Sequence, residues 1–256
     1  MNQDDRDAFD DALLCSRMTA HGPGEFVGQE NFMRASEILS LAARARITSS
    51  SSVLDLCCGV AGPGRLIART TGCSYFGVDS SAAAIRIARE RARGLRCEFA
   101  VADVPPVPDG AFDVVLLLET MLAFREKQPL LEGIARMLRV GGRFAFTLEA
   151  GEPLTCAERS RMPDADTVWL TPLPTMLSCL DQVGLRARWV ADHSETHRAT
   201  VEALLGAYTA DGDAIAARVG RSALDDLLGA HHLWRAWLLD GRVRKFAVVA
   251  EKTASR

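Results

Sequence analysis

The chain has 256 residues, of which 30 are basic and 33 acidic, and its formal net charge is −3. Because these charges are dispersed rather than gathered in a block, the sequence predicts no nucleic-acid partner. The amino terminus is acidic where a signal peptide is basic, and no apolar run approaches the ~20 residues of a membrane span, so we expect a cytoplasmic protein without a membrane partner.

The first part of the chain alternates between helix-like and strand-like segments. Residues 1–47 mix polar and apolar positions at helical spacing and predict an N-terminal helical cap. With helical segments between them, apolar strands are expected at residues 53–57, 74–79, 96–103, 112–119 and 143–151. The helix over 130–142 is expected to end at the pair Gly141 and Gly142. Such repeated strand, helix and strand units require right-handed crossovers, so they predict a doubly wound, mainly parallel sheet.

The second part is less regular. Residues 152–174 are rich in proline and predict an irregular loop over the active face. A helix and a strand follow, up to residue 192, and the last strand is expected at 242–252. The sequence thus predicts one α/β domain over 1–256. It begins with an N-terminal helical cap (1–47) and a cofactor-binding core (48–151). A loop with a helix and a strand (152–194), a helical insertion (195–240) and the last strand with its tail (241–256) follow.

The stretch VLDLCCGVAGPGR places a strand, a glycine turn and a helix in the order that a nucleotide-type cofactor needs. Gly59 lacks a Cβ atom, so the backbone can turn sharply there and a ligand can come close. Asp79 closes the second strand about 20 residues later, where its carboxylate can accept hydrogen bonds from both ribose hydroxyls. A dinucleotide site has the same acidic residue, but its G-x-G-x-x-G fingerprint needs a glycine where this chain has Cys57. The turn therefore argues against NAD.

Four stretches in order, VLDLCCGVAGPGR, GVDSS, VADVPPVPDGAFDVVLLLE and MLRVGGRFAFT, resemble the successive motifs of class I S-adenosylmethionine-dependent methyltransferases. The GxxGPxR ending is similar to the small-molecule branch that includes sterol, tocopherol and methylated-amine methyltransferases. The resemblance covers about residues 50–150. It implies S-adenosyl-L-methionine as the cofactor and a Rossmann-like, seven-stranded sheet.

The resemblance also implies roles for individual residues. Asp55 orients the turn and faces the methionine amino group, while Gly59 passes under the cofactor. Asp79 binds the ribose, and Glu119 lies near the amino-acid end of the cofactor and the methyl acceptor. The cofactor-binding residues implied in this way are Asp55, Cys57, Gly59, Asp79, Ser80, Asp103, Val104 and Glu119, with Asp103 and the backbone of Val104 at the adenine. Glycines of the family are replaced at Cys57 and Ala61, which predicts a tightened site.

Other conspicuous residues are expected to be structural. Asp113 opens a strand on the side away from the ligand, and Cys57 and Cys58 are expected to pack rather than act as nucleophiles. The seven cysteines form neither a disulfide framework nor a metal-ligand spacing. His193 and His197 are four residues apart, but DHSETH reads as the exit from a strand and no third ligand is apparent, so no metal is expected.

Methyl transfer is an in-line displacement, so an enzyme mainly has to align the nucleophile and strip water from it. An amine or hydroxyl acceptor also has to lose a proton, and the candidate bases are Glu119, Glu149, His193, His197, His231 and His232. Glu119 and Glu149 each end a central strand, where open α/β sheets bind ligands, and with His193 they are our predicted catalytic residues. Helix capping or pairing with an arginine is an equally open role for both glutamates.

The side chains around these candidates leave the acceptor open. Met121, Leu122 and Phe124 predict either an apolar pocket wall or ordinary core. Trp234 and Trp237 share a helix face, where they either line the pocket or pack against the sheet. Four basic residues near the last strand either hold an anionic group of a substrate or are simply exposed: Arg235, Arg242, Arg244 and Lys245.

Methyl transfer to a small-molecule acceptor at N, O or C is therefore the predicted function, carried out by a monomer or homodimer. Aromatic and acidic residues are mixed in the segments outside the cofactor-binding core, and this mixture slightly favours amine or cationic acceptors. C-methylation of an isoprenoid or lipid-like acceptor is an alternative. Two readings from other classes also stay open: a non-catalytic cofactor-binding partner protein and a nicotinamide-dependent reductase.

Overall fold

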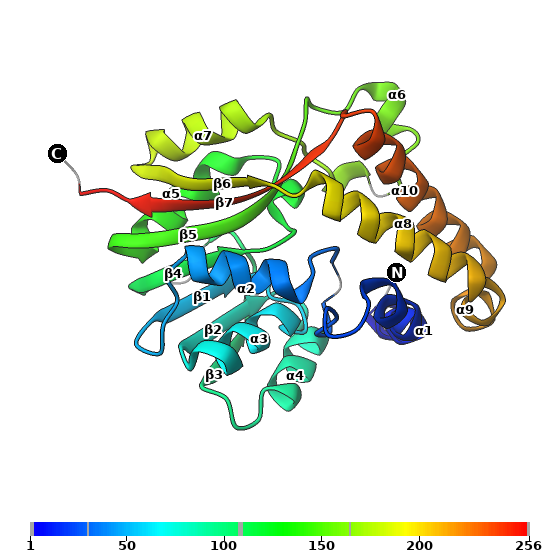
Figure 1. Ribbon diagram of the computed structural model, residues 1–256, viewed down its shortest axis with the longest axis horizontal. Coiled ribbons are helices and arrows are strands. Elements are labelled where there is room, and N and C mark those ends of the chain that lie inside the picture. Colours follow the sequence, from blue (N-terminus) through cyan, green and yellow to red (C-terminus); the bar gives the residue numbers. More distant parts are fainter. Residues whose placement is uncertain (1–2, 30, 107–109, 164, 255–256) are drawn as a thin grey trace.

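The computed structural model describes residues 3–29, 31–106, 110–163 and 165–254, with side chains from residue 12 onward. Seven described strands form one sheet in the order β3-β2-β1-β4-β5-β7-β6 (Figure 1). β7 pairs antiparallel with both of its neighbours, whereas the other pairs are parallel. The strands are β1 (Ser52–Leu56), β2 (Ser74–Asp79), β3 (Cys97–Val101), β4 (Phe112–Leu117), β5 (Leu138–Ala150), β6 (Leu185–Asp192) and β7 (Arg244–Lys252). The predicted doubly wound, mainly parallel sheet is confirmed.

Alternating side chains of the central strands separate two hydrophobic cores. Val53 of β1 and Val114 of β4 pack on one face with α2 (Ala35–Arg44), α3 (Gly62–Thr71) and α4 (Ala82–Arg91). Leu54 and Val115 pack on the other face with α5 (Lys127–Met137) and α7 (Leu173–Gln182). The two central strands β1 and β4 are thus buried on both faces, as is typical of apolar strands inside a parallel sheet. Figure 1 shows the two helical layers on opposite sides of the sheet.

A separate helical layer extends from one end of the sheet (Figure 1). It consists of α1 (Gln3–His21), α8 (Ser194–Ala210), α9 (Gly212–Val219) and α10 (Arg221–Leu239). Leu13 of α1 is fully buried against Leu204 and Tyr208 of α8 and Ile215 of α9. α1 and the segment before β7 therefore meet in space, although the sequence separates Leu13 from Leu204 by nearly 200 residues.

The predicted helix end at the glycine pair is wrong. α5 ends at Met137, and β5 begins at the next residue and runs through Gly141 and Gly142. The register of β4 against β5 shifts between Phe112 and Val114, which accommodates the extra residues as an irregularity in the ladder. A Cβ atom at position 142 would lie 2.8 Å from the Arg139 carbonyl oxygen, so Gly142 permits the close approach within this bend.

The irregular segment before α7 contains α6 (Cys156–Arg159) and the short 3-10 helix η2 (Ala165–Thr167), while η1 (Met121–Ala123) follows β4. Among the helices in the described part of the chain, none combines the length and the apolar character needed to cross a membrane.

Candidate functional site

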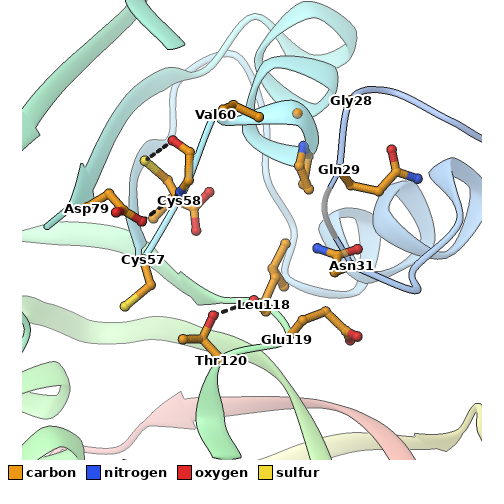
Figure 2. A pocket seen from close by; sticks show the side chains of 14 residues that line it. Gly28, Gln29, Asn31, Cys57, Cys58, Val60, Asp79, Leu118, Glu119 and Thr120 are labelled. Carbon is orange, nitrogen blue, oxygen red and sulfur yellow. Dashed lines mark hydrogen bonds between the residues drawn. The ribbon is translucent and has the colours of Figure 1, made fainter. Parts of the chain in front are cut away.

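A pocket of about 280 Å³ lies where the carboxyl ends of three adjacent strands meet (Figure 2). Asp55 of β1, Asp79 at the end of β2 and Glu119 just beyond β4 line it. Gln29 and Asn31, from the segment between α1 and α2, face the pocket from the side opposite Asp79. The described residues that line the pocket therefore include three carboxylates but no lysine, arginine or histidine.

The turn between β1 and α3 has an unusual backbone. Cys57, Gly59 and Ala61 have φ angles of 57°, 53° and 56°, in the left-handed region where residues with a Cβ atom are strained. This explains why glycine suits positions 57 and 61 in the resembled family, and each replacement costs about 1–2 kcal/mol. A Cβ atom on Gly62 would lie 2.7 Å from the carbonyl carbon of Gly28, so this glycine lets the N-terminal segment approach the turn.

Asp79 holds the turn in place. Its Oδ2 accepts a hydrogen bond from the Gly59 N–H at 2.8 Å, and its Oδ1 accepts one from the Ser81 N–H at 2.9 Å. Each carboxylate oxygen has a further lone pair available for a ligand. The same side chain can therefore shape the pocket and bind a ligand in it.

Asp55 is 3% exposed and is held by a residue that our sequence analysis missed. The Tyr75 hydroxyl, buried in β2, donates a hydrogen bond to Asp55 Oδ2 at 2.5 Å. Burial raises the pKa of Asp55 to about 7; the hydrogen bond from Tyr75 opposes this shift, and the nearby charge of Asp79 adds to it. A cation in the pocket would therefore stabilise the ionised form of the Asp55 carboxylate.

The two adjacent cysteines are poor nucleophiles. Burial is the main cause that raises the pKa of Cys57 to about 12, and the charges of Asp79 and Asp55 raise it further. The pKa of Cys58 is also raised, mainly by burial. Both thiols are therefore protonated near neutral pH, which agrees with the expected packing role.

Glu119 has a strained backbone, with a φ angle of 59°. The conformation is supported by its N–H, which donates to Thr147 Oγ1 in β5 at 2.6 Å. Thr147 is 1% exposed and thus has a fixed position. The contact fixes the backbone of Glu119, whose side chain lines the pocket (Figure 2).

Thr147→Val is expected to lower the free energy of unfolding by about 1–3 kcal/mol, because the Glu119 N–H loses its acceptor while the side-chain volume is kept. Urea denaturation measures the change. Thr209→Val is the matched control, since the hydroxyl of this exposed residue donates to the Leu205 carbonyl oxygen of its own helix, and should cost less than about 0.5 kcal/mol. Equal stability of the wild type and Thr147→Val would show that this contact contributes nothing.

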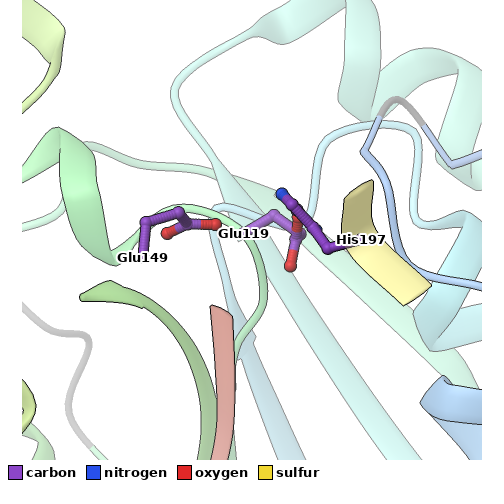
Figure 3. Close-up of side chains that lie close together, drawn as sticks. All are labelled: Glu119, Glu149 and His197. Carbon is purple, nitrogen blue, oxygen red and sulfur yellow. The ribbon is translucent and has the colours of Figure 1, made fainter. Parts of the chain in front are cut away.

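Two of the predicted catalytic residues meet beneath the pocket. Glu119 and Glu149 both form ion pairs with the ammonium group of Lys245, which is 2% exposed. His197, at the start of α8, lies beside the two carboxylates (Figure 3). We call these four residues, Glu119, Glu149, His197 and Lys245, the buried cluster. Lys245 was one of several basic candidates for a substrate anion, but the structure pairs it with carboxylates of the chain itself.

The third predicted catalytic residue lies elsewhere. His193 precedes α8, and its Nδ1 is 3.3 Å from Oε1 of Glu37 in α2. It is absent from the described lining of the pocket, whereas His197 reaches Glu119 and Glu149. DHSETH reads as a strand exit in the sequence, whereas a helix begins at Ser194 and places His197 beside the two glutamates. The catalytic role of His193 stays a prediction. His231 is also engaged, through its Nδ1 with the Leu227 carbonyl oxygen at 2.8 Å.

Three of the predicted cofactor-binding residues, including the two expected at the adenine, lie outside the lining of this pocket as described. Ser80 and Asp103 are exposed, and Val104 is half-buried. Their cofactor roles stay predictions. Asp113 lies at the opposite edge of the sheet, where it accepts a hydrogen bond from Ser52 N–H at 2.8 Å and pairs with Arg139. This contact agrees with its expected structural role.

The basic candidates for a substrate anion are all paired within the chain. Arg242 binds Glu158 in the irregular segment, with Nε to Oε1 at 2.6 Å and Nη2 to Oε2 at 3.0 Å. Arg244 pairs with Asp192, and Arg235 with Glu202. Trp234 and Trp237 contact each other edge to face, 5.6 Å between ring centroids, and pack with the irregular segment rather than the sheet.

Comparisons with known proteins identify relatives of one part of the chain. Residues 53–142 match a family model described as a methyltransferase domain. Methyltransferase GfsG of Streptomyces halstedii is 35% identical over 112 residues, which are 41% of this chain and 40% of that protein. Sterol 24-C-methyltransferase of Eremothecium gossypii is 37% identical over 111 residues, 41% of this chain and 30% of that protein.

Among solved structures, mycolic acid cyclopropane synthase CmaA1, complexed with SAH and CTAB, has a TM-score of 0.83 with this chain. The match covers 96% of this chain and 95% of that one at 12% identity, and therefore establishes a shared fold. The sequence matches span less than half the length of the two curated relatives. The family match runs from β1 into β5 and contains all three carboxylates of the pocket.

Proposed function

We propose that this chain, whose residues 53–142 form a class I S-adenosylmethionine-dependent methyltransferase domain, transfers a methyl group to an amine or hydroxyl of a small molecule. The resemblance predicted from the four sequence motifs is confirmed by the family match and by the two curated methyltransferases, which are 35% and 37% identical to the chain over 112 and 111 aligned residues. The acceptor and the roles of individual residues belong to the proposal.

The charge of the pocket is the observation that carries the proposal. S-adenosylmethionine has a positive sulfonium and an ammonium group, and the described lining of the pocket has three carboxylates and no basic side chain. Such a site attracts a cation and repels the pyrophosphate of a dinucleotide. The chemistry of the residues present therefore fits S-adenosylmethionine and disfavours the nicotinamide alternative.

When bound, S-adenosylmethionine supplies the electrophilic methyl group. The chain itself has to bind, orient and exclude water, and we assign these tasks to the pocket carboxylates. Asp79 receives the ribose hydroxyls, Asp55 faces the amino group, and Glu119 faces the acceptor. Gln29 and Asn31 of the N-terminal segment enclose the same space from the other side.

The side chains around Glu119 favour a polar acceptor over an isoprenoid. Met121, a candidate for an apolar wall, is fully buried and packs with α5 in the core below the sheet. Leu122 packs with the two tryptophans and the irregular segment. Thr120, Gln29 and Asn31, which line the pocket with Glu119, are polar.

The proposal is tested first by calorimetric titration with S-adenosylhomocysteine and, separately, NADH. We expect S-adenosylhomocysteine to bind in the micromolar range and NADH not to bind. Turnover is then measured as release of S-adenosylhomocysteine from S-adenosylmethionine with phosphoethanolamine, sarcosine, octanoic acid and geranyl diphosphate. We expect an amine in this panel to react. Failure to bind S-adenosylhomocysteine at millimolar concentration would end the methyltransferase proposal.

A further inference from the structure

The buried cluster has the donor set of a metal site. One ligand atom each from Glu119, Glu149 and His197 lies within 4.8 Å of the other two (Figure 3). Glu149 and His197 are each 4% exposed, and the Glu119 side chain is 8% exposed. Two carboxylates and one imidazole at such distances commonly bind a divalent metal ion in other proteins.

Here the chain supplies its own cation. Lys245 faces Glu149 directly across the antiparallel ladder of β5 and β7, and its ammonium group pairs with both glutamates. The backbone of Lys245 is fixed as well. Its N–H donates to Ser194 Oγ at 3.0 Å, and its carbonyl oxygen accepts the His193 N–H at 2.8 Å. The residue that carries the ammonium group thus also fixes the start of α8.

The charges in the cluster do not cancel. Burial lowers the pKa of His197 to about 3, so its ring is neutral. Burial disfavours the ammonium form of Lys245, but the charges of Glu119 and Glu149 outweigh it and raise its pKa. Two carboxylates and one ammonium group leave a net negative charge. Glu119 is the member of the cluster that lines the pocket.

We propose that Lys245 is a positioning residue, which takes the place of a metal ion among Glu119, Glu149 and His197 and holds the Glu119 carboxylate at the acceptor end of the pocket. The inference rests on the proposed function, because Glu119 has an acceptor only if the chain transfers a methyl group. Without the ammonium group Glu119 loses the ion pair that fixes its carboxylate, whether or not Glu149 is charged, and it no longer presents a fixed negative charge to the acceptor.

Lys245→Met tests the placement of the ammonium group without any acceptor. The methionine keeps the side-chain length but frees the three ligands, so the variant is expected to bind Co²⁺ and develop a visible absorption band that the wild type lacks. The double variant E119Q/K245M has lost one ligand and should lose most of this band. A band of equal strength in the wild type, or no band in Lys245→Met, would overturn the inference.

Turnover tests the effect on Glu119. With sarcosine, or another compound of the panel that reacts, kcat of Lys245→Met should fall about 100-fold, because misplacing a group at the reacting centre by about 1 Å can cost that much. The dissociation constant of S-adenosylhomocysteine should change less than about threefold, because Asp55 and Asp79 are untouched. Lys245→Arg, which keeps the charge, should recover part of the lost kcat. Unchanged kcat in Lys245→Met contradicts the positioning role.

Loss of a buried charge can also prevent folding, so a second variant is needed. E149Q/K245M removes one charge of each sign and restores the charge balance of the cluster. We expect a thermal midpoint closer to the wild type but a kcat as low as that of Lys245→Met, whereas recovery of kcat would overturn the proposal. If the wild type neither binds S-adenosylhomocysteine nor reacts with the panel, the proposed function fails, and the Co²⁺ titration still decides where the ammonium group lies.

Discussion

Replacing Asp79 with alanine is expected to weaken binding of S-adenosylhomocysteine by about 30- to 1000-fold, which corresponds to roughly 2–4 kcal/mol. Two losses combine in this variant. The ribose hydroxyls lose a charged acceptor, and the N–H groups of Gly59 and Ser81 lose the carboxylate that holds the turn. Because Cys57 and Ala61 strain this turn, its conformation depends on such contacts. Calorimetric titration measures the change.

Two controls separate these losses from general damage to the fold. Asp79→Asn retains an acceptor oxygen of similar reach but not the charge, and should cost about tenfold in affinity. Asp113→Ala removes another carboxylate that holds a backbone N–H, at the opposite edge of the sheet. It should lower stability and leave the affinity nearly unchanged. If Asp79→Ala binds as tightly as the wild type, the ribose site lies elsewhere.

The sequence predicts those residues of the site that lie at the ends of strands. Asp55, Asp79 and Glu119 each stand in or just after an apolar segment that reads as a strand, and parallel strands bring their carboxyl ends to one edge. Asp55, for example, is level with Gly77 of β2 and Leu116 of β4 in the sheet. A pattern within each segment is therefore enough to predict that the carboxylates converge.

Other partners depend on register, which no local pattern shows. Tyr75 reads as an ordinary apolar strand residue, and only the pairing of β1 with β2 brings its hydroxyl to Asp55. Lys245 stands opposite Glu149 because β7 inserts antiparallel beside β5, across a sequence separation of 96 residues. The place of His197 depends on where α8 begins. These contacts form only when distant segments fold together.

The structure is needed to explain how the turn accommodates the two residues that replace glycines of the resembled family. The sequence shows that Cys57 and Ala61 replace glycines, and it predicts a tighter site. The structure adds that both residues have left-handed backbones, and that Ala61 is fully buried before α3. The turn therefore keeps the conformation that glycine allows, at a cost in strain that Asp79 offsets through its hydrogen bond to Gly59.

The affinity for S-adenosylhomocysteine is expected to fall about tenfold per pH unit as the pH drops below about 7. In the free protein the pKa of Asp55 is raised to about 7, mainly by burial. The ligand's ammonium group favours the ionised carboxylate, so binding below this pKa requires the release of a proton. Above it the affinity should be constant. Asp55→Asn, which cannot titrate, should bind more weakly and without this pH dependence.

The same pKa shift affects folding with the opposite sign. The folded protein binds the proton of Asp55 more tightly than the unfolded chain, whose carboxyl has a pKa near 3.8. Its contribution to stability is therefore fully present below about pH 3.8 and is lost as the pH rises through about 7. Ionised Asp55 thus destabilises the folded protein without a ligand, and a cation in the pocket reduces this destabilisation.

Tyr75→Phe tests whether Asp55, rather than another titrating group, causes the pH dependence of the affinity. The Tyr75 hydroxyl lowers the pKa of Asp55, so its removal raises that pKa further and moves the fall in affinity to higher pH. Titrations of both proteins between about pH 5.5 and 8.5 measure the displacement. An affinity curve that is flat over this range in the wild type, or that stays in place in Tyr75→Phe, would show that Asp55 does not face the ligand's ammonium group.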